Sequence, residues 1–439
     1  MSETTARSGQ ESWKKAATPE VVVSALWLIF GLQGCLWLGP LCVEAMRPAP
    51  GRVNDFYQDW GSARNHLVGL PVYTHHATSI PRHLGLPFDS TTDVEYNAHP
   101  PTSVLLTLPL AWLDYPDAVL VWNTFSLAAF LTSLVITAVV LRVPRTLFLP
   151  ALALLTFCHP LYGNLYQSQL TLFLVFLVTM IWALERSGRS SAAGLVLGAA
   201  AAIKLFPAYL IVYYAARGHL RTLLTTAASF LALTFATALV LGLDAYSDYV
   251  QVVLPAQVKF RSLGYNYAIA GFWHKLFDPA SELGSITPLW SKPALARWGT
   301  ILSDLAITAI VAPFAHWARS AAQRDFAFAS VVTAMLLVSP VTWDTSLLLL
   351  SVPIALLARS AETSRWMPAT LVLILVVLWM PQIILTKLAL AGRSLRVAPW
   401  TFMLGAPSLK FYALLAIFAL GLAAGRAGEK TDQAVPSRA

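Results

Sequence analysis

Apolar segments without charged residues recur along the chain and constrain its fold more than any other feature. The first, residues 21–43, is uncharged over 23 residues, which exceeds the core of a signal peptide. It has no small-residue cleavage site, so we predict a retained membrane anchor. Charged residues make up 12% of the 439-residue chain, whereas soluble domains carry about a quarter. These features predict an all-α integral membrane protein.

Twelve such segments are candidates for membrane spans, although several are shorter than the ~20 residues of a full crossing. They cover residues 21–43, 118–141, 146–160, 168–184, 190–203, 205–216, 222–243, 298–317, 326–341, 344–358, 366–385 and 409–425. A further apolar run, residues 100–113, would reach only ~20 Å as a helix, short of a hydrocarbon core of ~30 Å.

Basic residues lie mostly in pairs between the apolar segments, and these pairs predict the topology. Cytoplasmic loops carry an excess of Lys and Arg. All pairs share one side if 100–113 is an interfacial helix and if 190–216 crosses twice, with a break at residues 204–207. The pairs are Lys14/Lys15, Arg142/Arg145, Arg186/Arg189, Arg217/Arg221, Arg319/Arg324, Arg359/Arg365 and Arg426/Lys430.

This arrangement predicts about 12 transmembrane helices with both chain ends in the cytoplasm. A polar N-terminus (1–20) would precede one transmembrane domain (21–425) and a cytoplasmic tail (426–439). Two outer loops, about 44–116 and 245–295, are long enough to be functional rather than simple connectors. The dispersed positive charge argues against a nucleic-acid partner. The three cysteines lie in apolar segments, so we predict neither disulfides nor a cysteine metal site.

The outer side then gathers polar residues that could perform chemistry. They are Asp55, Asp59, Glu95, His99, Gln169, Lys204, Arg261, Asn266, His274, Asp344, Arg393 and Arg396. A carboxylate facing several cations suits a transfer reaction, because the carboxylate can take a proton from a hydroxyl while cations hold a leaving phosphate. A single displacement needs only one such base.

Each of the main candidates also has a structural interpretation. Asp55 could cap the helix that starts at residue 56, because Asp is a favoured N-cap. Asp59 and Arg64 could form a solvated ion pair. Lys204 lies between two apolar stretches, where a charge is costly and therefore indicates function, but it could instead extend its amine to the membrane surface. Pro207 should break the helix there.

The remaining polar residues are more ambiguous. Gln169 could serve only to satisfy backbone groups, and Asp304 could be a helix–helix contact or part of a pathway. Trp343 could anchor the chain at the membrane interface or contact a sugar. The histidines lack metal-ligand spacing, so we predict no metal and no cofactor.

Six stretches, in order along nearly the whole chain, resemble family 87 glycosyltransferases of the GT-C fold class, and the chain is similar to the mycobacterial polyprenyl-phosphate-mannose-dependent mannosyltransferases. "DFYQDWGSARNHLVGLPVY" resembles the Asp-Phe, Ala-Arg and Gly-x-Pro-x-Tyr elements. "YNAHPPTSVLLTLPLAWL" resembles a Tyr-Pro-Pro segment, with His99 in place of the Tyr. "SQLTLFLVFL" is similar to a Gly-Gln-x-Asn span start, from which Ser168 and Thr171 depart. "AGLVLGAAAAIKLFP", "GYNYAIAGFWHKLF" and "LVSPVTWDTSLLLL" resemble three later elements.

The resemblance implies a polyprenyl-phosphate-linked sugar donor, used on the outer face of the membrane with inversion at the anomeric carbon. It implies a base in the first outer loop, which corresponds to Asp55, and an interfacial helix after that loop. It also places Lys204 at the family Lys, and we infer that this residue holds the donor phosphate. In many relatives a His follows the Trp-Asp pair, whereas Thr345 stands here, which puts that role in doubt for this chain.

We therefore expect a GT-C-type glycosyltransferase of the plasma membrane that moves a hexose, mannose first, to a hydroxyl of a lipid or glycan acceptor. Arg261, Arg393 or Arg396 would assist Lys204 at the phosphate. The other substrate contacts would come from Asp59, Arg64, His99, Gln169, Asn266, His274, Trp343 and Asp344. The main alternative is a transporter or lipid flippase, which should show repeats and several polar residues at mid-depth. A non-catalytic scaffold would leave Asp55 and Lys204 dispensable.

Overall fold

The computed structural model describes residues 19–89, 94–143, 145–278, 286–360, 367–390, 398–399 and 404–433. The first third contains one long N-terminal helix and a set of short helices before the next long one. These elements are α1 (Pro19–Glu44), α2 (Phe56–Leu67), α3 (His76–Leu84), α4 (Pro101–Thr107), the 3₁₀ turn η1 (Leu108–Trp112) and α5 (Tyr115–Leu141).

The middle of the chain alternates long helices with short turns. It comprises α6 (Arg145–Leu155), α7 (His159–Gln167), α8 (Thr171–Arg186), α9 (Ser190–Ile203), η2 (Phe206–Leu210), α10 (Ile211–Ala216) and α11 (Leu220–Leu241). A run of short elements follows: α12 (Leu243–Asp248), η3 (Tyr249–Val253), α13 (Leu254–Ala256), η4 (Gln257–Ser262) and α14 (Ile269–Phe277).

The last part of the chain is again built from apolar helices. It comprises α15 (Pro293–Trp317), α16 (Ala321–Val338), η6 (Asp344–Leu350), α17 (Ser351–Ser360), α18 (Met367–Trp379), α19 (Gln382–Leu390), η9 (Ala406–Ser408) and α21 (Leu409–Gln433). Two short strands, β1 (Ile286–Thr287) and β2 (Ala398–Pro399), pair in parallel. This pair is the one addition to the predicted all-α class among the described residues.

The predicted class, a polytopic helical membrane protein, is confirmed in this coarse form. Six helices of the described residues are long and apolar enough to cross a membrane, or seven if the bent pair α6–α7 forms one span. Several of the other predicted spans are shorter helices, such as α9 and α18. The count of about 12 spans and the interfacial position of α4–η1 stay predictions.

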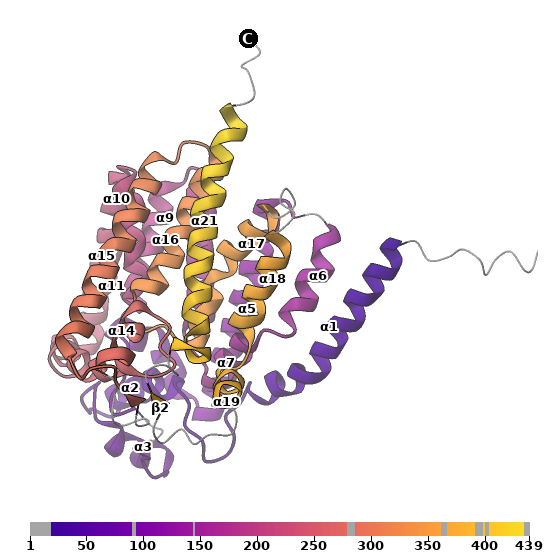
Figure 1. The fold of residues 1–439 in the computed structure, drawn as a ribbon. Coiled ribbons are helices and arrows are strands. Elements are labelled where there is room, and N and C mark those ends of the chain that lie inside the picture. Colours follow the sequence, from indigo (N-terminus) through magenta and orange to yellow (C-terminus); the bar gives the residue numbers. More distant parts are fainter. Residues whose placement is uncertain are drawn as a thin grey trace, which may run out of the picture.

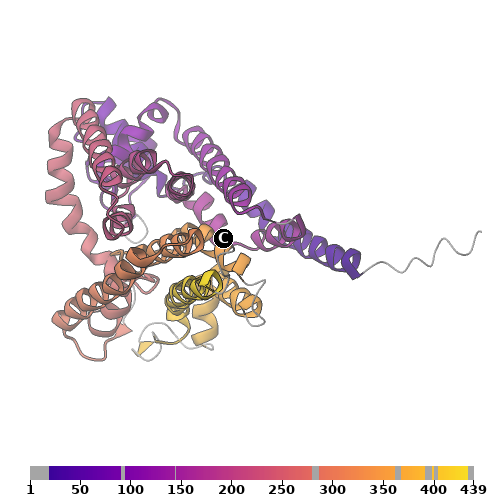
Figure 2. The same cartoon turned by 90° about the horizontal axis from the view of Figure 1, so that it is seen from above.

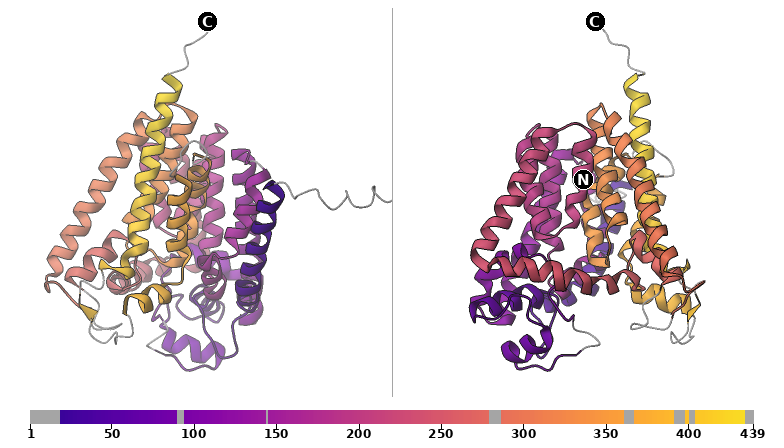
Figure 3. Two further views of the ribbon diagram at one scale, coloured as in Figure 1. Left: turned by 45° about the vertical axis from the view of Figure 1, so that its right-hand side comes forward. Right: turned by 90° about the vertical axis from the view of Figure 1, so that its left-hand side faces the viewer.

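The elements of the two predicted outer loops gather at one end of the bundle. α2, α3 and α14 lie at this end, and the C-terminal helix α21 leads away from it (Figure 1). Further views show the stretch from α12 to η4 running across the same end (Figure 3). The connections α8–α9, α10–α11 and α15–α16 lie at the opposite end (Figure 1). The elements of the predicted outer loops and these three connections therefore lie at opposite ends of the bundle (Figure 1).

Helix α9 packs closely against α11 and so fixes the position of the residue that follows it. A Cβ atom at Gly198 would lie 2.4 Å from the carbonyl oxygen of Thr226, and one at Gly194 would lie 2.4 Å from that of Thr222. Glycines spaced four apart allow two helix backbones to approach in this way. In contrast, α1 lies at the periphery beside α6 (Figure 2).

The predicted break in the 190–216 region is confirmed. α9 ends at Ile203, and Lys204 follows with an extended backbone (φ −149°, ψ 131°). Pro207 then lies in the first turn of η2, where its missing N–H costs no helical hydrogen bond. The break places a lysine at the end of α9 instead of inside a continuous helix.

Candidate active site

Asp55 occupies the N-cap position of α2, but its side chain does not cap the helix. The neighbouring Asn54 side chain accepts a hydrogen bond from the Phe56 N–H at 3.2 Å instead. The interpretation of Asp55 as a helix cap is therefore wrong. Its carboxylate is partly exposed and is left to interact with groups from other elements.

One of those groups is Gln169, in the turn between α7 and α8. Its Nε2 donates a hydrogen bond to Asp55 Oδ2, so its side chain does more than satisfy local backbone groups. Ser168, just before it, has a φ of 51°, a conformation that favours glycine. Asn54 Nδ2 donates to Ser168 Oγ at 3.0 Å, and Trp122 Nε1 donates to its carbonyl oxygen at 3.1 Å. These contacts hold the turn that presents Gln169.

Asp59 lies one helical turn after Asp55 and is 1% exposed. Its Oδ2 is 2.8 Å from His99 Nδ1, and its Oδ1 accepts from Ser103 Oγ at 2.6 Å and from Asn97 Nδ2 at 3.3 Å. The proposed solvated pair with Arg64 is therefore wrong. Asp59 is a buried carboxylate whose described partners all come from the stretch around α4.

His99 is fixed through its backbone as well as through its ring. Its N–H donates to Asn97 Oδ1 at 2.9 Å, and its carbonyl oxygen accepts from Tyr73 Oη at 2.6 Å. Two prolines follow it, which confines its backbone to extended conformations. Gly69, with a φ of 75°, lies in the turn after α2 from which the chain returns toward Tyr73. The stretch from α2 to Tyr73 thus supports His99.

Lys204 completes this group of polar residues. Its ammonium interacts electrostatically with both Asp55 and Asp59 and lies 5.8 Å from the centroid of the Phe206 ring. It makes no hydrogen bond or ion pair with the part of the chain that the structure describes. This interaction with two carboxylates does not fit an amine that extends to the membrane surface.

The two carboxylates of α2 differ in their protonation equilibria. Burial raises the pKa of Asp55 above its ordinary value, and His99, the hydrogen bond from Gln169 and the charge of Lys204 offset this only in part. Burial acts in the same direction on Asp59, but the electrostatic interaction with His99 and the three hydrogen bonds outweigh it and lower the pKa of Asp59. Two groups with separated pKa values can take different roles.

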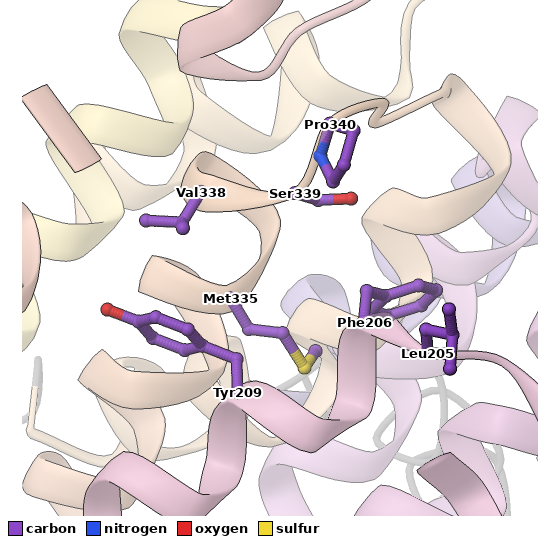
Figure 4. A pocket seen from close by; sticks show the side chains of 7 residues that line it. All are labelled: Leu205, Phe206, Tyr209, Met335, Val338, Ser339 and Pro340. Atoms are coloured by element: carbon purple, nitrogen blue, oxygen red, sulfur yellow. The ribbon is translucent and has the colours of Figure 1, made fainter. Parts of the chain in front are cut away.

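An apolar cavity of about 280 Å³ lies next to Lys204. Figure 4 shows side chains of η2 facing those at the end of α16 across it. The lining residues are Leu205, Phe206, Tyr209, Met335, Val338, Ser339 and Pro340. Because Leu205 and Phe206 directly follow Lys204, the charged end of that lysine and the apolar cavity are neighbouring features.

Arg64 is held away from this group. It lies nine residues after Asp55, two and a half turns of helix, and so faces the opposite side of α2. Its Nη1 donates to the Ala111 carbonyl at 2.5 Å, and its guanidinium lies 5.6 Å from the Trp60 ring centroid. The structure does not support the expected contact between Arg64 and a substrate at Asp55.

Asn266 joins two loops. Its Nδ2 donates to the carbonyl oxygens of Arg261 and Pro340 at 3.0 and 2.9 Å, and its Oδ1 accepts from the N–H groups of Ala268 and Thr342, both at 3.0 Å. These four bonds use both donors and both acceptor positions of the amide. Asn266 therefore holds the 261–268 loop to the 340–342 loop, and no donor remains for a sugar or a phosphate.

Arg261 and His274 form a separate group in the second predicted outer loop. His274 Nδ1 is 3.2 Å from Asp278 Oδ2, and Arg261 interacts electrostatically with His274 and with Asp304 of α15. The structure does not bring His274 to Asp55. The two other predicted phosphate ligands, Arg393 and Arg396, lie outside the described residues.

Trp343 contributes to an aromatic group that reaches the Asp55 site. Its ring lies 5.2 Å from that of Tyr265 and 6.3 Å from that of Phe260, centroid to centroid. Tyr265, a residue that the sequence reasoning missed, interacts electrostatically with Asp55. Trp343 thus approaches the site through Tyr265, and its contact with a sugar stays a prediction.

Asp344 forms a second buried ion pair instead of joining Asp55. It accepts a hydrogen bond from Lys410 Nζ at the start of α21. The Lys410 side chain is fully buried, whereas that of Asp344 is 21% exposed. Lys410 was missed as well, although the argument used for Lys204 applies to it, since it is a charge at the edge of an apolar segment.

A family model described as glycosyltransferase family 87 matches residues 97–340, more than half of the chain. The chain belongs to glycosyltransferase family 87. Family membership identifies the protein as a membrane-embedded glycosyltransferase. It argues against the two alternatives from the sequence, a transporter or lipid flippase and a non-catalytic scaffold. Residues 97–340 include His99, Gln169 and Lys204, while Asp55 precedes them.

Two curated relatives carry the same name, polyprenol-phosphate-mannose-dependent alpha-(1-2)-phosphatidylinositol mannoside mannosyltransferase. The one from Mycolicibacterium smegmatis is 25% identical over 362 residues, covering 77% of this chain and 76% of the relative. The one from Mycobacterium tuberculosis is 29% identical over 225 residues, covering 47% of this chain and 49% of the relative. No solved structure matches the chain.

The family 87 resemblance explains one departure in physical terms. Ser168 stands where the family motif has glycine, and it adopts the left-handed conformation that glycine permits most easily.

The sequence reasoning also missed Arg52, which interacts electrostatically with Asp55 and lies 3.2 Å above the Tyr166 ring centroid. Its position three residues before Asp55 was the available signal.

Proposed function

We propose that this family 87 enzyme moves a hexose, mannose first, from a polyprenyl-monophosphate-linked donor to a hydroxyl of a lipid or glycan acceptor. The reaction would take place on the outer face of the plasma membrane. One observation carries the proposal: a partly exposed carboxylate, Asp55, interacts electrostatically with Lys204, an ammonium without a hydrogen-bond or ion-pair partner among the described residues. This pairing supplies a base and a phosphate ligand within one site.

Lys204 would hold the donor phosphate. An ammonium that is shielded from water and already in place stabilises the negative charge that develops on the leaving oxygen. The carboxylates of Asp55 and Asp59 keep Lys204 oriented toward the site before the donor arrives. Arg52 interacts with the same Asp55 carboxylate and offers a second cation from a different element.

Asp55 would act as the base in a single in-line displacement. Its carboxylate takes the proton of the acceptor hydroxyl, and the acceptor oxygen forms the new bond to the anomeric carbon. The bond between that carbon and the phosphate oxygen breaks, and its electron pair leaves with the phosphate. One displacement inverts the anomeric configuration. The hydrogen bond from Gln169 orients the carboxylate toward the acceptor.

The apolar cavity beside Lys204 would receive the first units of the prenyl chain. A donor whose phosphate meets Lys204 has its lipid attached at that phosphate, so the chain must start within a few ångströms of the lysine. The cavity lining from Leu205 to Tyr209 begins at the next residue. Burying apolar carbon stabilises a complex by about 0.8 kcal/mol per CH₂ group, which favours a lipid-linked donor over a soluble one.

The proposed topology has about 12 spans, with α2, α3 and α14 on the outer side and α4–η1 at the interface. Its support is the separation of these elements from the connections α8–α9, α10–α11 and α15–α16 at the opposite end (Figure 1). Residues 21–425 would form a single transmembrane domain. The relatives' names also suggest the acceptor class, a mannose-bearing glycolipid.

A donor panel tests this function. Purified protein in detergent, supplied with a membrane-lipid extract, would receive labelled mannose, glucose and arabinose on the same short polyprenyl phosphate. We expect transfer from the mannose donor and an anomeric configuration in the product opposite to that in the donor. Retention of configuration would refute the single displacement, and transfer from none of the three donors would refute the proposed function.

The cavity is tested with two donors that differ in prenyl length. Val338→Trp fills the cavity from α16, which does not contribute to the Asp55 group. We expect the KM for the longer-chain donor to rise at least several-fold, while a water-soluble, very short-chain donor is used almost as before. Equal effects on both donors would place the lipid elsewhere.

A further inference from the structure

We propose that His99, oriented by Asp59, accepts from Asp55 the proton that Asp55 removes from the acceptor hydroxyl. This inference rests on the proposed function, because it assigns the next step for the same proton. Asp55 is thereby returned to its ionised form at the end of each displacement. His99 acts on the reacting groups through Asp55, and Asp59 is a positioning residue.

The ring of His99 is held in one orientation. Its Nδ1 lies 2.8 Å from Asp59 Oδ2, and the side chains of His99 and Asp59 are 8% and 1% exposed. Asp59 is itself fixed by Ser103 Oγ at 2.6 Å and by Asn97 Nδ2 at 3.3 Å. A carboxylate with three donors and almost no exposure has little freedom to turn, so the imidazole that it binds is fixed as well.

This contact also selects the tautomer of His99. An ionised carboxylate only accepts hydrogen bonds, so the Asp59 contact requires the proton on Nδ1. Nε2 then carries a lone pair. It takes no hydrogen bond from the residues that the structure describes. The arrangement matches other sites in which a carboxylate fixes the orientation and tautomer of a histidine base.

The His99 ring that carries this lone pair also interacts electrostatically with Asp55. Asp55 and Asp59 are four residues apart at the start of α2, a spacing that puts them on one face of a helix. Among the titratable groups that interact with Asp55, His99 has the largest electrostatic effect. The ring therefore binds Asp59 directly and interacts electrostatically with Asp55, which lies one helical turn before Asp59.

The proton balance of the displacement calls for such an acceptor. A phosphodiester donor with one negative charge becomes a phosphate monoester with two, and the acceptor proton moves to Asp55. If it stayed there, the base would be neutral for the next cycle. Transfer to His99 gives an imidazolium beside the ionised Asp59 and restores the Asp55 carboxylate. The proton then leaves to the phosphate or to water, and the total charge is unchanged throughout.

Other groups that face this pair will also shape its pH dependence. The charged and titratable neighbours are Arg52, Tyr73, Tyr115, Lys204 and Tyr265, contributed by five different segments. None of them is changed by a substitution at His99. A change in the pH profile of a His99 variant therefore reports on the imidazole and on its electrostatic effect on Asp55.

The test uses His99→Asn, because the Asn amide can donate to Asp59 in place of Nδ1 while it removes Nε2. Positioned proton transfer contributes about 10²-fold or more, so we expect kcat to fall about 100-fold. The KM for the donor should change less than about threefold, and the acid limb of the pH profile should move. His66→Asn, a histidine on α2 outside this group, is the matched control. Unchanged kcat and pH profile in His99→Asn would overturn the proposal.

A second measurement does not depend on activity. Nitrogen NMR of protein labelled at histidine, with His99→Asn used to assign the signal, reports which ring nitrogen carries the proton. We expect Nδ1 protonated and Nε2 unprotonated in the wild type, and a mixture in Asp59→Asn. Protonation on Nε2 alone would overturn the proposal. Inactivity of the wild type with every donor would instead refute the proposed function, and the NMR result would still decide the tautomer.

Discussion

Gln169 Nε2 donates a hydrogen bond to Asp55 Oδ2 and so joins two segments that are 114 residues apart in the sequence. Asp55 precedes α2, and Gln169 precedes α8. The bond fixes the carboxylate from outside its own helix. The same carboxylate interacts electrostatically with His99 and Lys204.

Because the pKa of Asp55 is raised in the folded protein, ionisation of its carboxylate lowers the free energy of unfolding. Between the ordinary pKa of Asp and the raised one, the folded protein binds more protons than the unfolded chain, so the free energy of unfolding decreases as pH rises through that window. Asp55→Asn removes this cost and can still accept the bond from Gln169. We expect its Tm to exceed that of the wild type at neutral pH, and the difference to shrink toward about pH 4.

Thermal unfolding in detergent, followed by intrinsic fluorescence across this pH range, checks the prediction. Asp114→Asn is the control, because Asp114 is exposed at the N-cap of α5 and makes no capping hydrogen bond there. A Tm gain that is the same at both pH values, or absent at both, would contradict the account of Asp55.

Lys204→Met removes the proposed phosphate ligand. Hydrogen bonds to charged groups contribute about 1.5–3 kcal/mol, so kcat/KM for the donor should fall about 10- to 100-fold. Lys204→Arg keeps the charge and should recover part of the loss. Lys292→Met, at an exposed position before α15, should behave as the wild type. Steady-state transfer kinetics measure these values. Equal kcat/KM for Lys204→Met and Lys292→Met would exclude Lys204 as the phosphate ligand.

Gly198→Ala tests whether the α9–α11 contact positions Lys204. The added Cβ would lie 2.4 Å from the Thr226 carbonyl oxygen and 2.7 Å from Ser229 Cβ, so the helices must separate. Overpacking of this kind costs roughly 1–3 kcal/mol. Gly39→Ala in α1 is matched, because its Cβ would meet nothing within 4 Å.

We expect a lower Tm and a lower transfer rate for Gly198→Ala, and neither change for Gly39→Ala. Both variants differ from the wild type by the same methyl group on a helical glycine. Similar Tm values for the two would mean that the close approach of α9 and α11 does not constrain the site.

The Asp344–Lys410 pair predicts an asymmetry in stability. Removing one partner of a buried ion pair costs roughly 3–5 kcal/mol, because the other charge stays buried without compensation. Lys410 is fully buried, whereas 21% of the Asp344 side chain is exposed and can be hydrated. Asp344→Asn should therefore lower the Tm more than Lys410→Met does.

The double variant Asp344→Asn, Lys410→Met should be more stable than Asp344→Asn alone, since neither charge remains. Thermal unfolding of the four proteins gives the coupling free energy directly. If the two single substitutions simply add, the two groups do not form the pair that the structure shows.

Much of the site follows from local sequence. A charge within an apolar stretch, followed by Pro207, predicted the break at Lys204. Asp55, Asp59 and Gln169 were also among the polar residues that the sequence placed on the outer side. The partner of Asp59 was not, because a fully buried bond between α2 and residue 99 depends on how α4 packs against α2. The sequence instead suggested Arg64, which is near in number and faces the other side.

Residues with several possible partners were assigned least well. Asn266 reads as a polar group in a functional loop, but the structure uses its whole amide to hold backbone of another loop. Lys410 and Asp344 lie 66 residues apart, and no local pattern connects them. Span number is also weakly determined, because helices such as α9 are 14 residues long and length alone does not decide whether they cross.

Transfer from labelled polyprenyl-phosphate-mannose by the wild type and by Asp55→Asn is the most direct test of the central claim. The substituted protein should keep its fold, shown by a Tm at least equal to that of the wild type. We predict transfer by the wild type and a loss of about 10²-fold or more in Asp55→Asn, with Asp114→Asn fully active. Transfer at the wild-type rate by folded Asp55→Asn would contradict the account and move the base to another carboxylate.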